Sequence, residues 1–172
     1  MIKLYNRTRL PDDALKSLLV EAARLAGARG GIVVKVTATR RRRSASGLAY
    51  RACSVSQQYL MGCGRRWIKT NDGYIVLRVP IRAWDREMSQ SVARRVFQLA
   101  IHEFVHVRDY QHGEDFSHRT SLFRRPRWED RIEEVRACEM TDEALSKLER
   151  MTERRAHIDA LIKALAQAME VT

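Results

Sequence analysis

Five consecutive residues, His102-Glu103-Phe104-Val105-His106, constrain this chain more than any other feature of its sequence. They lie in a stretch predicted to be helical from residue 90 to 111, because its apolar residues recur at helical spacing. Residues four apart on a helix share a face, so His102 and His106 can contact the same ion. Glu103 lies about 100° around the helix from His102, where it can reach a water molecule on that ion. The pattern therefore predicts a metal site with an adjacent base.

The residues that flank this helix predict where it begins and ends. Ser89 is expected to cap its N-terminus, and Gly113 is expected to stop it. A polar loop follows, and Pro126 is expected to begin a second helix that runs through Arg136 to at least Met140. Two helices are therefore predicted in the second half of the chain before its C-terminal segment.

The first half of the chain predicts one helix and several strands. Pro11, two acidic residues after it and apolar residues at helical spacing indicate a helix over 11–26. β-Branched residues indicate the strands, and Asp72-Gly73 indicates a tight turn between the last two. We therefore expect an α+β fold with a small, mostly antiparallel sheet. The predicted strands are residues 32–39, 48–55, 65–70 and 74–81.

From residue 141 onward nearly every residue is a good helix former. Apolar residues recur there at alternating steps of four and three, the spacing of a heptad seam. We expect residues 1–140 to form one domain and residues 141–172 to form a C-terminal helical extension. The extension is predicted either to pack on that domain or to join copies of the chain into a homo-oligomer. The seam consists of Ala144, Leu148, Met151, Ile158, Ile162, Leu165 and Met169.

Positive charge is concentrated in the first half of the chain. Residues 1–88 contain 18 Lys and Arg against 6 Asp and Glu, whereas residues 89–172 contain 14 against 15. Arginine binds phosphate and carboxylate through two parallel hydrogen bonds, so nucleic acid is a candidate partner. A nucleic-acid-binding module is accordingly one alternative function. The preference for arginine over lysine can equally reflect the base composition of the genome. The densest run of cations is Arg40, Arg41, Arg42 and Arg43.

The composition also excludes several classes of protein. No apolar stretch approaches the roughly 20 residues that a membrane span needs, and the first residues lack the apolar core of a secretory signal. Cys53, Cys63 and Cys138 form no C-x-x-C pair, which argues against a disulfide framework and a zinc finger. We therefore expect a soluble, cytoplasmic protein without a membrane partner.

The segment Leu99–Gln111, which reads LAIHEFVHVRDYQ, resembles the active-site helix of the zincin metallopeptidases. The resemblance covers about residues 66–140, and only the HExxH pattern within it is strongly specific. It implies a zincin-like fold and a bound Zn²⁺ that activates water for hydrolysis of a peptide or protein substrate. It also implies that Glu103 acts as general base and then as acid. The strand Tyr74–Val79 is expected to be an edge strand above the cleft, to which a peptide can add.

A zincin needs a third metal ligand, and the sequence offers competing candidates. His112 completes the spacing HExxHxxxxxH, which resembles the metzincins and the SprT-like and WLM-type proteases. Metzincins have Gly where this chain has Asp109, and an unbroken helix would put His112 about 80° off the ligand face. Glu134 resembles the second-helix glutamate of the gluzincins, and the small side chain of Ala137 permits close approach of that helix. We predict the ligands His102, His106 and Glu134, with His112 next and Glu133 last.

Choosing His112 would imply a different function, because SprT-like proteases act on DNA-bound proteins. A DNA-associated protease of this kind is the second interpretation of the site, and a metal-binding relative without protease activity is a third. Asp109 is expected either to orient the histidines or to be a plain exposed carboxylate. Four residues have the chemistry to stabilise a developing oxyanion, and the sequence assigns the role to none: Tyr74, Tyr110, His118 and Arg136.

Overall fold

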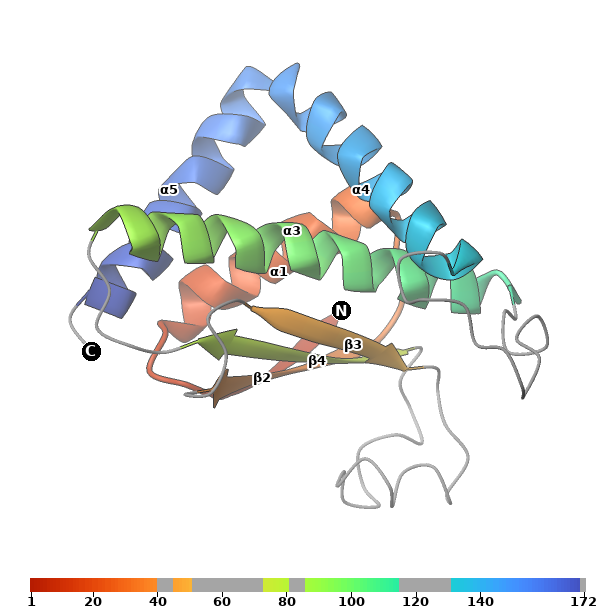
Figure 1. Ribbon diagram of the computed structural model, residues 1–172, viewed down its shortest axis with the longest axis horizontal. Helices are drawn as coiled ribbons and strands as arrows, with labels where there is room; N and C mark the ends of the chain where they lie inside the picture. The colour runs from red at the N-terminus through yellow and green to blue at the C-terminus, as the bar shows by residue number, and fades with distance from the viewer. Residues whose placement is uncertain (40–44, 51–72, 81–85, 115–130, 171–172) are drawn as a thin grey trace.

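The computed structural model describes residues 1–39, 45–50, 73–80, 86–114 and 131–170, which form an α+β fold (Figure 1). The α+β class predicted from the sequence is therefore confirmed. Across these ranges, no helix combines the length and the apolar character needed to cross a membrane. The elements in chain order are β1 (Ile2–Arg7), α1 (Asp12–Ala26), β2 (Ile32–Thr39), β3 (Ser46–Tyr50), β4 (Gly73–Pro80), α3 (Arg86–Gln111), α4 (Ile132–Glu149) and α5 (Thr152–Glu170).

The sheet is mixed, so the prediction of a mostly antiparallel sheet is wrong. Its strand order is β1-β2-β4-β3, with β1 parallel to β2, β2 parallel to β4, and β3 antiparallel to β4. β1 was not predicted from the sequence, because its polar residues Lys3, Asn6 and Arg7 obscure the alternation of apolar and polar side chains that is typical of a strand. Helix α1 crosses from the end of β1 to the start of β2, and such a crossover connection makes the two strands parallel.

The edge strand is also not the one predicted. β4, which contains Tyr74–Val79, lies between β2 and β3, so β3 forms the edge of the sheet in the described part of the chain. β3 covers the start of the strand predicted at 48–55, while residues 51–55 and the strand predicted at 65–70 lie outside the described residues. The run Arg40–Arg43 lies outside them as well.

One face of the sheet packs against α1 and α3 (Figure 1). Alternate residues of the inner strands, such as Val34, Val36 and Ile75, are buried there with the apolar residues of both helices. The middle of α3 is buried on nearly every side, since the sheet lies below it and α4 and α5 cover it from above. Because of this burial, His102 is only 8% exposed and Glu103 only 5% exposed.

Helix α3 begins earlier than predicted. It starts at Arg86, and Ser89 lies inside its first turns with no exposed surface instead of capping it. The other end agrees with the sequence analysis, because the helix ends at Gln111 and Gly113 follows with a positive φ of 79°. Glycine adopts this conformation at little cost, so it terminates the helix.

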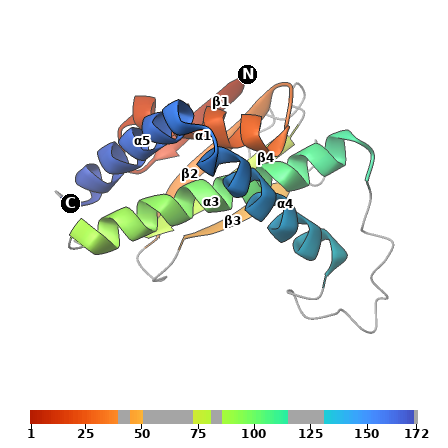
Figure 2. The same cartoon turned by 90° about the horizontal axis from the view of Figure 1, so that it is seen from above.

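The predicted C-terminal helical segment consists of two helices. α4 runs through residues 140 and 141 without interruption, and the chain turns at Arg150 and Met151 before α5 begins. α5 then packs back against α1 and α3 (Figure 2). Nε of Arg154 on α5 lies 2.6 Å from a carboxylate oxygen of Glu21 on α1. Met151 is exposed at the turn, while the other six seam residues are buried. The domain boundary and the association of copies stay predictions.

Candidate metal centre

Helices α3 and α4 bring together two histidines and one glutamate. Nε2 of His102 lies 3.1 Å from Oε2 of Glu134 and 3.2 Å from Nε2 of His106. Nε2 of His106 lies 3.5 Å from the same glutamate oxygen. Within the described part of the chain these three side chains form a group that could hold a metal ion.

The three distances match those expected around a tetrahedral ion. In a regular tetrahedron the ligand atoms are separated by about 1.6 times the metal–ligand bond. Bonds of about 2.0–2.1 Å to nitrogen and oxygen therefore require ligand atoms about 3.3–3.4 Å apart. The observed separations of 3.1, 3.2 and 3.5 Å bracket this value. The site can accept an ion with little movement of these side chains.

The charges at the site favour a bound cation. Burial alone would raise the pKa of Glu134, but its hydrogen bonds with His102 and His106 and their charges outweigh burial and lower this pKa to about 2. Burial would lower the pKa of His106, yet the hydrogen bond and charge of Glu134, followed by the charges of Glu103 and Asp109, raise it. Glu134 is therefore ionised at neutral pH, and its negative charge beside the two histidines favours a bound cation.

Contacts between the helices hold α4 in the position that the cluster requires. Ala137, one turn after Glu134, has no exposed surface, and its small side chain allows the two helices to approach closely. On the same side, a guanidinium nitrogen of Arg108 donates a hydrogen bond to the Met140 sulfur at 2.7 Å. The helices are thus joined one turn and two turns beyond the candidate ligand.

The buried carboxylate of Asp109 forms a second junction between the helices. It lies 2.6 Å from a guanidinium nitrogen of Arg108 and 3.4 Å from Nε of Arg136 on α4. Its partners among the described residues are these two arginines, so its structural role is to join α3 and α4. Its charge nevertheless acts on His106, whose pKa it helps to raise.

Glu103 lies on the other side of α3, against the edge strand β3. Its side chain is 5% exposed and packs on the backbone of Gly47. A Cβ atom at Gly47 would lie only 2.6 Å from Cγ and 2.7 Å from Cδ of Glu103, which is closer than real carbon atoms approach. Because Gly47 has no side chain, the Glu103 carboxylate can occupy this space.

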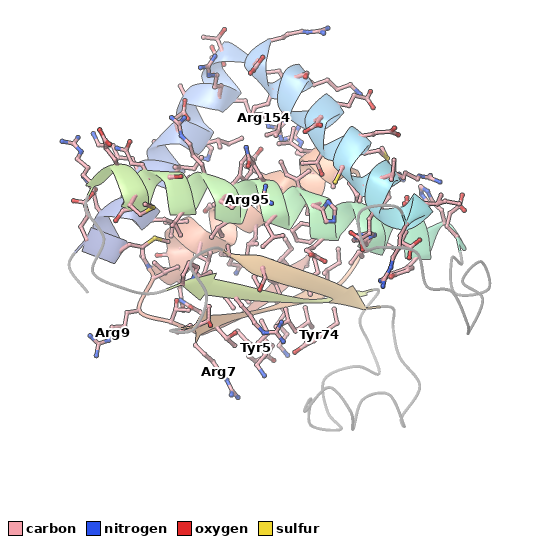
Figure 3. The ribbon with its side chains drawn as sticks, viewed as in Figure 1. Tyr5, Arg7, Arg9, Tyr74, Arg95 and Arg154 are labelled. Atoms are coloured by element: carbon pink, nitrogen blue, oxygen red, sulfur yellow. The ribbon has the colours of Figure 1, made fainter. Side chains whose placement is uncertain are left out.

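A cleft of about 490 Å³ opens beside these residues, between β3, α3 and α4. His102 and Glu103 line it together, so one candidate ligand and the candidate base border the same space. Arg95, which projects from α3 toward α4 in Figure 3, and Asp142 also line the cleft. The cleft is thus bordered by one histidine of the cluster, by the Glu103 carboxylate and by the charged side chains of Arg95 and Asp142.

The other residues singled out in the sequence are not part of this cluster. His112 follows the end of α3 and is exposed, and Glu133 is not part of the group that contains its neighbour Glu134. Tyr74 lies on the sheet face away from the helices (Figure 3). Arg136 pairs with Asp109 and Glu114, and His118 lies outside the described residues.

Sequence reasoning missed Gly47 and gave Cys138 no role at the site. Gly47 carries no local sequence signal, and only the sheet order brings it to Glu103. Sγ of Cys138 lies 4.0 Å from Nδ1 of His102, on the ring nitrogen opposite the cluster. The sequence places Cys138 one helical turn after Glu134, because residues four apart on a helix are neighbours.

Comparison of the chain with protein-family models, with curated proteins and with solved structures gave no match. The chemistry of the site is therefore inferred from its own geometry.

Replacing Gly47 with Ala should displace the Glu103 carboxylate, because the added methyl group needs the space of its Cγ and Cδ atoms. If Glu103 acts as the base, we expect hydrolysis of a peptide to fall by about 100-fold, the cost of misplacing a catalytic group by about 1 Å. Metal content, measured by elemental analysis, should not change.

Gly73→Ala is the matched control. A Cβ atom at Gly73 would crowd Val107, which lies on α3 one turn beyond Glu103, but not Glu103 itself. It should lower the melting temperature without a selective loss of hydrolysis. An equal loss of activity in both variants would mean that Gly47 matters only for packing of the sheet on α3.

Proposed function

We propose that this protein is a zinc-dependent metallopeptidase whose active site resembles that of the zincins. His102, His106 and Glu134 hold the ion, and Glu103 serves as general base and then as general acid. One observation carries the proposal: the three ligand atoms are 3.1–3.5 Å apart, and His102 among these ligands lines a cleft together with Glu103.

Zinc fits this donor set better than other common ions. Two imidazole nitrogens and one carboxylate oxygen form the three-ligand set of catalytic zinc sites, which leaves a fourth tetrahedral position for water or substrate. Calcium and magnesium prefer six or more oxygen ligands, and this group offers two nitrogens. Zinc bound here would lower the pKa of a water molecule from about 15.7 toward 7.

The protein residues then supply the proton transfers. Glu103 follows His102 directly on α3, so its carboxylate can accept a proton from water held beside the histidines. Its burial against β3 holds it on the cleft side, and the same group can return the proton to the departing amine. Proton transfer by a positioned side chain contributes about 10²–10⁴-fold to a rate.

A peptide is the substrate that suits the walls of the cleft. β3 is the last strand of the described sheet, and its residues Ser46 and Gly47 line the cleft. An extended peptide can add to a sheet edge by main-chain hydrogen bonds, which would lay a scissile bond along the side of α3 that carries His102 and Glu103. A substrate bound in this way is selected by its extended backbone.

The direct test is to remove the metal and then restore it. Treatment with a chelator should abolish hydrolysis of a quenched fluorescent peptide library, and one equivalent of Zn²⁺ should restore it, with one zinc per chain by elemental analysis. Mg²⁺ and Ca²⁺ should restore nothing, because they bind this donor set poorly. Activity that survives complete metal removal would contradict the proposal. So would a zinc-loaded protein that cleaves no peptide in the library, which would favour a metal-binding protein without protease activity.

A further inference from the structure

The four strands contain four basic residues and no Asp or Glu. In β1, β2 and β4 the residues that alternate with these cations, such as Leu4, Val36 and Leu77, pack into the core beneath α1 and α3. Successive side chains of a strand point to opposite faces, so the cations lie on the face away from the helices. Figure 3 shows Tyr5 and Arg7 projecting from that face. We call Lys3, Tyr5, Arg7, Lys35 and Arg78 the basic sheet face.

The strand register spreads these side chains over the sheet. Thr37 on β2 pairs with Arg7 of β1 on one side and with Arg78 of β4 on the other. The two arginines are therefore two strands apart, or about 10 Å at a strand spacing of about 4.8 Å. Tyr5 is paired directly with Lys35 in the row before them. The cations therefore form a broad field and not a single anion pocket.

Part of this face is accessible to a partner. Lys3 and Arg7 are exposed, and Tyr5, Lys35 and Arg78 are half-buried. Val33 and Tyr74 on the same face are buried, so across β2 and β4 the accessible area lies toward the carboxyl ends of the strands. Arg9, which is also exposed, follows β1 at that end (Figure 3).

The charge and the side chains of this face indicate what kind of partner it can bind. Protein surfaces usually intersperse both signs of charge, and a field of cations without a carboxylate attracts a polyanion. Tyr5 lies within the field, with Nζ of Lys3 5.5 Å from the centre of its ring. Cations that follow a phosphate backbone, combined with an aromatic ring on which a base can stack, are the elements of single-stranded nucleic acid binding.

We propose that the basic sheet face binds single-stranded nucleic acid. The broad face of a sheet does not enter the major groove of a duplex, which admits a helix or a two-stranded ribbon. Lipid binding needs a cluster of large apolar side chains for insertion, and the accessible positions are mainly cationic or polar. This binding is independent of the metallopeptidase activity, because the face lies on the opposite side of the sheet from α3.

The test measures binding of a fluorescent 20-nucleotide oligo(dT) to the full chain by anisotropy over a range of salt concentrations. We expect the logarithm of the affinity to fall linearly with the logarithm of the salt concentration. The variant Lys3→Gln, Arg7→Gln, Lys35→Gln and Arg78→Gln should bind at least tenfold more weakly. Its salt slope should fall by about 2–3, at about 0.7 for each phosphate that the variant no longer neutralises. Tyr5→Leu should weaken binding about fivefold or more by removing the stacking surface.

A control variant carries the same change of charge on the helical layer. It replaces four exposed residues on α3, on α4, just after α4 and on α5: Arg94→Gln, Lys147→Gln, Arg150→Gln and Lys163→Gln. The affinity for the oligonucleotide should stay within about twofold. Equal losses in both variants would contradict the proposal, since binding would then follow net charge alone. It would also be overturned if only anionic vesicles bound, or if only substitution of Arg40–Arg43 removed binding. Melting temperatures of all variants should agree within a few degrees.

Discussion

Replacement of Glu103 by Gln is expected to lower peptide hydrolysis by about 10²–10⁴-fold while zinc stays bound. The substitution keeps the volume that packs on Gly47 but removes the group that accepts the proton. Glu103 is not part of the cluster formed by His102, His106 and Glu134, so the donor atoms are unchanged. The measurements are kcat/KM for a fluorescent peptide and zinc content by elemental analysis.

Gln98→Glu in the Glu103→Gln background provides a useful control for charge. Gln98 lines the same cleft from the same helix, so the double variant has the original net charge with the carboxylate in the wrong position. Hydrolysis should not return, because proton transfer requires a carboxylate within hydrogen-bond reach of the water. Full activity in the single variant Glu103→Gln would show that Glu103 is not the base.

The second large effect concerns the third ligand. Glu134→Ala is expected to weaken zinc binding by more than about 100-fold, because removing a residue that only supports a ligand already costs about 10–100-fold. Glu133→Ala removes the same charge from the adjacent residue and should leave zinc affinity nearly unchanged. His112→Ala should also retain zinc, since this exposed residue follows the end of α3 outside the cluster. Competition with a chromogenic chelator measures all three affinities.

The opposite pattern would change the assignment of the site. Loss of zinc in His112→Ala together with its retention in Glu134→Ala would mean that the chain bends near Asp109 when the ion binds. Such a result would favour the spacing of the SprT-like and WLM-type proteases. The ion pairs of Asp109 with Arg108 and Arg136 oppose such a bend, because they fix this turn of α3 to α4.

Local sequence patterns predicted the elements whose signals are contained within a few turns. The helical spacing around His102 predicted α3, and Gly113 predicted its end correctly. β1 was missed because its polar residues make it resemble a loop, and its strand character depends on pairing with β2. The turn at Arg150 was also missed, since nearby residues favour a continuous helix. The packing of Ile158 and Leu165 in the core accompanies the reversal of the chain there.

In the candidate site, too, local patterns predicted some residues and could not predict others. The histidines and Glu103 follow from helix geometry alone, and Ala137 indicated where a second helix could approach closely enough for Glu134 to reach them. Gly47 could not be found in this manner. Its importance depends on the order of the strands, which puts β3 at the edge of the described sheet and Gly47 against Glu103. A mixed sheet with a missed first strand could not be ordered from local patterns.

The position of Glu134 at the first turn of α4 has a consequence for the connectivity of the chain. Between this residue and His106 lie 27 residues, so one ion bound to both would close that length into a loop. A cross-link of this kind reduces the conformational entropy of the unfolded chain, as a disulfide does. Metal supply would thereby set the amount of folded protein as well as its chemistry, and chains made without the ion would be the ones exposed to degradation.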